Sequence, residues 1–181
     1  MTNPSTGTSS PTTTDTQERR DLLEALGTHR AFLRHTVRDL TDEQARLRPT
    51  TSALCLGGLV KHVAATEAQW ASFIEHGAAA MAPADDPDAG ARWADGFDMA
   101  AGDTLTDLLD RYQRVADHTD RLVDALASLD DGHPLPEAPW FPPGTAWSHR
   151  RVLTHIVAET AQHAGHADII RESIDGAKTM G

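Results

Sequence analysis

Hydrophobic side chains recur three or four residues apart in four long segments of the chain, the spacing that places them on one face of an α-helix. The predicted helices run from about Asp15 to Leu40, from about Leu56 to His76, from Thr104 to about Leu126, and from Ser148 to about Ile174. No stretch alternates polar and apolar residues over a length that predicts a β-sheet. The pattern therefore indicates an all-α protein.

Local signals mark several helix ends. Ser148 is a favourable N-cap for the last helix, and Gly77 and Gly176 follow the second and fourth helices, where glycine commonly ends a helix. Thr41 and Gln44 have the spacing of a capping box, which predicts a short extra turn after the first helix.

Two connections lack helical periodicity. Residues 78–103 contain two prolines, three glycines and six aspartates, and residues 132–147 contain five prolines. Four helices with a long crossover between the second and third predict a four-helix bundle over residues 15–175. Residues 1–14 are expected to form a disordered tail and residues 176–181 a short C-terminal tail.

The composition narrows the classes of function. The chain has 16 basic and 27 acidic residues, a formal charge of −11, which argues against nucleic acid or anionic membrane as a partner. It lacks a signal peptide and an apolar run of membrane-spanning length, so a cytoplasmic protein is expected. Cys55 is the single cysteine, so no intrachain disulfide can form, and a small buried side chain is favoured over a reactive thiol.

Four polar residues lie on one side of the fourth predicted helix: His155, Glu159, His163 and His166. Glu159 and His163 fall within the apolar stripe, where an unpaired carboxylate is costly to bury. A divalent metal would supply a partner, and His62 on the second helix is available as a third ligand. The alternative is a buried, hydrogen-bonded polar group without a metal.

The segments RHTVRDLTDEQARLRPTTSALCLGGLVKHVAATEAQW and RRVLTHIVAETAQHAGHADIIRESIDG resemble the DinB superfamily, in particular the branch similar to the N-terminal domain of mycothiol-dependent maleylpyruvate isomerase. The resemblance implies a four-helix bundle with a long crossover. It also implies a divalent metal, Zn²⁺ first with Ni²⁺ or Mn²⁺ as alternatives, bound by His62, Glu159 and His163. In that branch the first ligand on the fourth helix is Glu, as it is here.

The resemblance further implies an enzyme that uses a low-molecular-weight thiol, mycothiol, for transfer to or isomerisation of a small electrophile. A bound metal would lower the pKa of the thiol. The alternatives are a thiol-independent metal-dependent hydrolase and a non-catalytic, metal-stabilised binding or stress-response module. The sequence ends at Gly181 without the isomerase's second domain, so maleylpyruvate is not the expected substrate. Members of the superfamily are often homodimers, and a homodimer is expected here.

Further candidates surround the predicted centre. His166 is expected to act as an acid or base beside the metal, with direct ligation or a surface position as alternatives. Tyr112 either reaches the metal pocket or packs in the core. Arg150 and Arg151, in the first turn of the fourth helix, are candidates for binding an anionic substrate, and Trp147 for covering the site.

Two buried polar positions have a structural interpretation. Glu67 lies on the apolar stripe of the second helix, where a pair with an arginine of the first helix is favoured over a role as catalytic base. His155 is expected to be structural.

Overall fold

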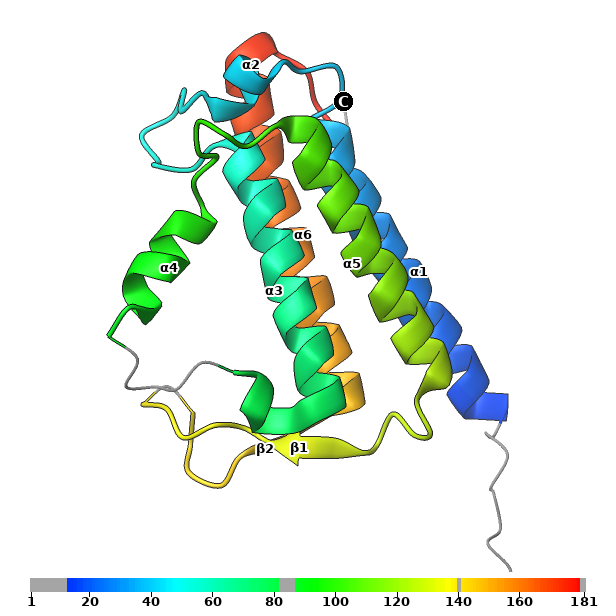
Figure 1. Ribbon diagram of the computed structural model, residues 1–181. Coiled ribbons are helices and arrows are strands. Elements are labelled where there is room, and N and C mark those ends of the chain that lie inside the picture. The colour runs from blue at the N-terminus through cyan, green and yellow to red at the C-terminus, as the bar shows by residue number, and fades with distance from the viewer. Residues whose placement is uncertain (1–12, 82–86, 140, 180–181) are drawn as a thin grey trace, which may run out of the picture.

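The computed structural model describes residues 13–81, 87–139 and 141–179. Its main elements are four long helices: α1 (Thr13–Thr36), α3 (Leu56–His76), α5 (Leu105–Ala125) and α6 (His149–Asp175). They pack side by side as a bundle, with α6 against both α1 and α3, and α3 against α5 (Figure 1). The predicted all-α bundle is confirmed.

The shorter elements lie at the two ends of the bundle and along its side. They are α2 (Asp42–Arg46), the 3-10 helix η1 (Gly77–Ala80), α4 (Ala89–Gly96), and the strands β1 (Gly132–Pro134) and β2 (Ala146–Ser148). After η1 the chain returns along the outside of the bundle, through α4, before α5 begins (Figure 1). As a result α3 and α5 run in the same direction, antiparallel to α1 and α6. The connection between α3 and α5 is the long crossover that the sequence predicts.

The helix ends follow the predicted signals. α3 has the predicted bounds, and its C-cap Gly77 has a φ of 65°, a left-handed value that favours glycine. Thr41 forms the capping box with Gln44 at the start of α2, and the Ser148 hydroxyl accepts a hydrogen bond from the Arg151 amide at the start of α6. α1 ends four residues earlier than Leu40 because the chain turns there, and Asp39 has a φ of 60°.

The tails are only partly described. α1 already begins at Thr13, and the rest of the expected N-terminal tail, residues 1–12, lies outside the described residues. After Gly176, the amide and hydroxyl of Thr179 both donate to Asp168, so this part of the C-terminal segment folds back on α6.

The two connections without helical periodicity hold short elements that the sequence pattern does not indicate. The connection 78–103 contains η1 and α4, and the eight residues of α4 make only about two turns, too few for a hydrophobic period to show. The proline-rich connection is flanked by β1 and β2, which pair antiparallel with Gly132 opposite Ser148. Strands of three residues are too short to show alternation.

The strand pair fixes the start of α6. A Cβ on Gly132 would lie 2.1 Å from the carbonyl oxygen of Trp147, so only glycine fits at this crossing. Next to the pair, the His149 amide donates to the Asp131 carbonyl at 2.7 Å, and the Arg150 amide donates to the Leu129 carbonyl at 3.0 Å. Backbone hydrogen bonds therefore hold the first residues of α6 to the segment that follows α5.

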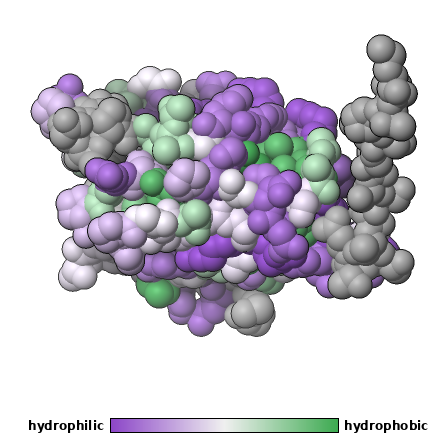
Figure 2. Space-filling model, turned by 90° about the horizontal axis from the view of Figure 1, so that it is seen from below, coloured by the Kyte–Doolittle hydropathy of each residue, from purple (hydrophilic) through white to green (hydrophobic). Residues whose placement is uncertain are grey.

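The hydrophobic core forms two clusters along the bundle, one with Leu33, Leu59 and Val60, the other with Leu26, Phe73 and Ile156. Cys55 is buried in the first cluster, as predicted. On the end of the molecule that carries the strand pair, hydrophobic and hydrophilic residues intermingle among the described residues (Figure 2). No helix within the described ranges combines the length and apolar character of a membrane span.

Candidate metal centre

His62 of α3 and the pair Glu159 and His163 of α6 come together between the two helices. Their potential ligand atoms all lie within 4.8 Å of one another. His163 Nε2 is 3.6 Å from Glu159 Oε2, and the rings of His62 and His163 meet edge to face with centroids 4.8 Å apart. The i, i+4 spacing on α6 places two of the donors on one face, and the packing of α3 against α6 adds the third.

The chemistry of this group fits a divalent ion. Burial lowers the pKa of His62 to about 4, with a further contribution from His163, and burial also lowers the pKa of His163. Both imidazoles are therefore neutral at neutral pH, the form that binds metals. Two nitrogen donors and one carboxylate are a common zinc ligand set, and ligands of one tetrahedral Zn²⁺ stand roughly 3.4 Å apart. The candidate ligand atoms, within 4.8 Å of one another, are spaced close to this distance.

The group is buried on one side and open on the other. The side chain of His163 is 9% exposed, whereas that of Glu159 is 29% exposed. His62 is also buried, at 8% exposed. A small molecule would therefore reach the group from the side of Glu159.

Phe97, in the segment after α4, was not among the predicted site residues. Its ring stacks on the His62 imidazole with centroids 3.7 Å apart and planes 19° from parallel, and it lies 5.7 Å from the His163 ring. The sequence offers one signal for this contact: the pair Gly57 and Gly58 has no side chains, which leaves room for the segment to cross α3.

The two flanking histidines of α6 lie on either side of the group. His166 Nδ1 is 3.5 Å from His163 Nδ1, beside the group and half-buried. His155 Nε2 is 3.9 Å from Glu159 Oε1, and its ring contacts the edges of Trp70 and Trp147. Neither histidine belongs to the group of three candidate ligands.

Trp147 and Arg151 form a stack next to this side of the centre. The Trp147 ring lies 4.9 Å from the Trp70 ring, almost parallel to it, and the Arg151 guanidinium lies 4.0 Å from the centroid of Trp147. Through His155, the stack is connected to Glu159. Trp147 thus reaches the Glu159 side of the group through His155, and substrate binding by Trp147 and Arg151 stays a prediction.

Arg150 has other partners. Its guanidinium binds the carboxylates of Glu18 on α1 and Asp130, with Nη2 at 2.9 Å from Glu18 Oε2. These bonds raise the pKa of Arg150 and lower that of Glu18. The structure gives Arg150 a role in joining α6 to α1, and substrate binding by this residue stays a prediction.

Tyr112 of α5 is fully buried in the first core cluster. Burial and the nearby Glu67 carboxylate raise its pKa, and the Arg34 guanidinium lies 5.0 Å from the centroid of its ring. Arg34 and Glu67 belong to α1 and α3, and Thr160 of α6 also lies near the Tyr112 hydroxyl. Tyr112 therefore packs in the core, and its catalytic role stays a prediction.

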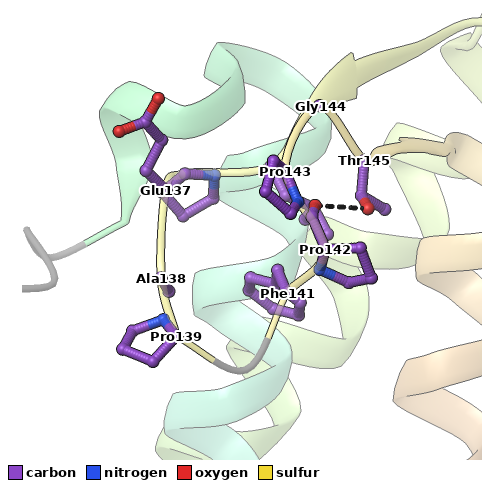
Figure 3. Close-up of a pocket in the computed structure, with 10 residues that line it drawn as sticks. Glu137, Ala138, Pro139, Phe141, Pro142, Pro143, Gly144 and Thr145 are labelled. Carbon is purple, nitrogen blue, oxygen red and sulfur yellow. Dashed lines mark hydrogen bonds between the residues drawn. The ribbon is translucent and has the colours of Figure 1, made fainter.

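A cavity of about 430 Å³ lies in the proline-rich loop between β1 and β2 (Figure 3). Residues 135–139 and 141–145 line it, most of them apolar, and the Thr145 hydroxyl donates to the Pro142 carbonyl at 2.7 Å. The cavity does not include the three candidate ligands. Phe141 in its wall contacts Trp147 with ring centroids 5.9 Å apart, so the cavity adjoins the aromatic stack.

The long crossover and the His/Glu/His group shared by α3 and α6 define a bundle of the DinB class. The family model described as mycothiol S-transferase matches residues 21–176, which include all three candidate ligands. The chain therefore belongs to the mycothiol S-transferase family.

Comparison with curated proteins gave no match. Among solved structures, the chain is similar to one described as the conserved protein of locus from Enterococcus faecalis, with a TM-score of 0.60 and 17% sequence identity. The similarity covers 87% of this chain and 97% of the other. At this level of identity it supports the fold alone.

Proposed function

We propose that the protein is a metal-dependent transferase that joins mycothiol to a small electrophile. The observation that carries the proposal is the meeting of His62, Glu159 and His163 within the segment that matches the mycothiol S-transferase family. Zn²⁺ is the first candidate for the ion and Ni²⁺ or Mn²⁺ are alternatives, because two imidazoles and a carboxylate suit all three.

A divalent ion at this site would supply a Lewis acid that lowers the pKa of a bound thiol. The protein's own residues prepare the site. Burial keeps His62 and His163 neutral, and Glu159 contributes the negative charge that a cation requires. His166 Nδ1 is 3.5 Å from His163 Nδ1, beside the group, where its imidazole can accept the thiol proton.

The electrophile is expected to bind on the open side, against Trp147 and Arg151. The guanidinium lies over the indole, which leaves its N–H groups in the plane available for an anionic group of the substrate. In a substitution, the thiol sulfur bonds to the electrophilic carbon, the leaving group departs with its bonding electron pair, and the thiol proton passes to His166.

Metal content and turnover test the proposal together. The purified protein, stripped with a chelator and reloaded with Zn²⁺, Ni²⁺ or Mn²⁺, is mixed with a chromogenic electrophile and with mycothiol, glutathione or no thiol. Conjugation that needs both a metal and mycothiol supports the proposal. Hydrolysis without thiol indicates the hydrolase, and metal binding without turnover with any thiol or electrophile indicates the binding module.

Variants separate the residue roles. His62→Ala and His163→Ala are expected to lose the metal, whereas His166→Ala retains the metal at wild-type stoichiometry but turns over more slowly. His118→Ala serves as the control, since His118 is an exposed histidine that pairs with Glu75 on the surface. Loss of metal in His166→Ala would instead make His166 a ligand.

A further inference from the structure

The connection between α4 and α5 brings one aromatic ring onto the candidate metal centre. Phe97 stacks on His62 at a centroid distance of 3.7 Å, compared with 4.8 Å between the rings of His62 and His163 and 5.7 Å between those of Phe97 and His163. His62 is the only one of the three candidate ligands on α3. On its own helix, the Thr66 hydroxyl one turn later lies 3.4 Å from His62 Nε2.

The segment that carries Phe97 is attached to α3 and to the turn before it. Lys61 Nζ donates to the Asp98 carbonyl and to the Asp103 carboxylate, both at 3.0 Å. Arg48 binds the Asp98 carboxylate at 2.5 Å. Asp98, the residue next to Phe97 in the chain, is thus held by both Lys61 and Arg48, which constrains the position of the Phe97 backbone.

Two glycines of α3 allow the segment to lie this close. A Cβ on Gly58 would be 1.9 Å from the carbonyl oxygen of Phe97, and a Cβ on Gly57 would be 2.2 Å from Met99 Sδ. Real Cβ atoms do not approach other atoms so closely. The glycine pair is thus a site of close approach between α3 and the segment that carries Phe97.

We propose that Phe97 is a positioning residue for the metal ligand His62. Its ring stacks on one face of the imidazole and so fixes the plane of that ring. The partners that orient ligating histidines commonly affect metal affinity about 10–100-fold. The inference rests on the metal-binding part of the proposed function.

Met99 provides a matched control on the same segment. It is 3% exposed and packs in the core cluster with Leu56 and Leu59, against Gly57. Truncation of Met99 removes packing of the segment but leaves the ring of Phe97 in place. A general packing role and a specific role for the ring therefore predict different results.

The test measures the Kd of Zn²⁺ by competition with a chromogenic chelator, together with the urea midpoint of each metal-free protein. We expect Phe97→Ala to weaken Zn²⁺ binding about 10–100-fold, with Phe97→Tyr close to wild type. Met99→Ala should unfold at lower urea with a Kd close to wild type. The visible spectrum of the Co²⁺-loaded protein should change in Phe97→Ala and stay unchanged in Met99→Ala.

Equal Zn²⁺ affinity in Phe97→Ala and wild type would overturn the inference and leave the proposed function intact. An equal loss of affinity in Met99→Ala would also overturn it, because packing alone would then account for the effect. A wild-type protein that binds none of Zn²⁺, Ni²⁺, Mn²⁺ or Co²⁺ would overturn both this inference and the proposed function.

Discussion

Arg30 of α1 and Glu67 of α3 form a buried, two-pronged ion pair, with Nη2 at 2.5 Å from Oε1 and Nε at 3.2 Å from Oε2. The side chains are 6% and 0% exposed. Arg30 Nη1 also binds Asp120 of α5 at 2.8 Å, so one guanidinium joins three helices. The predicted pairing of Glu67 with an arginine of the first helix is confirmed.

Removal of Glu67 should destabilise the bundle. Glu67→Ala leaves the Arg30 charge without its buried partner, which typically costs about 3–5 kcal/mol of unfolding free energy. Urea unfolding measures the loss. Asp120→Ala is the control: its side chain is 46% exposed, so its loss should cost less than about 1 kcal/mol. An enzyme that retains its stability but loses turnover in Glu67→Ala would restore the catalytic interpretation.

The glycines of α3 should differ in their tolerance of alanine. Gly58→Ala is expected to be the most damaging, because the new Cβ meets a backbone oxygen, and Gly57→Ala less so, because Met99 has a flexible side chain. Gly165→Ala, on an exposed turn of α6 with nothing within 4 Å, should be stabilising by about 0.5–1 kcal/mol. Thermal unfolding of the three variants gives the order, and equal melting temperatures would contradict it.

The stability of the metal-free protein should depend on pH through His62. Its pKa is about 4 in the folded protein and 6.5 in the unfolded reference, so the unfolded chain binds the proton more tightly. Stability is then full above pH 6.5 and falls as the pH drops towards 4, by up to about 3 kcal/mol. Urea midpoints between pH 7.5 and 4 measure this slope, and His62→Asn should flatten it. A slope unchanged in the variant would assign the effect to other groups.

The neighbouring arginines of α6 should have separable effects. Arg151→Ala is expected to raise the KM for an anionic electrophile with little effect on stability, since the exposed guanidinium contacts only the Trp147 face in the described structure. Arg150→Ala should lower the melting temperature, because it loses Glu18 and Asp130, and should raise that KM only if Arg150 also binds the substrate. Steady-state kinetics and thermal unfolding distinguish the two, and the reverse pattern would exchange the roles.

The long helices and the three candidate ligands could be predicted because each depends on local spacing. Periodicity defines a helix face within a few turns, and Glu159 and His163 share a face through their i, i+4 spacing alone. His62 could be added because its helix also has an apolar stripe that must turn inwards. The resemblance to the DinB superfamily agreed with this choice.

The remaining contacts depend on segments that are distant in sequence. Phe97 lies in a stretch without periodicity, so nothing local indicates that its ring reaches His62. Arg150 and Arg151 are adjacent and chemically alike, and about 100° of helix rotation sends one towards α1 and the other onto Trp147. Only the packing of whole helices determines such partners.

The register of the strand pair also sets the rotational phase of α6. Ser148, which lies opposite Gly132, is the N-cap of this helix, so a slip of one residue in the pairing would turn every later side chain by about 100°. Glu159 and His163 would then leave the face that meets His62. Changes in length between Leu135 and Thr145 lie outside the paired residues, so this part of the loop is free to diverge while the centre keeps its alignment.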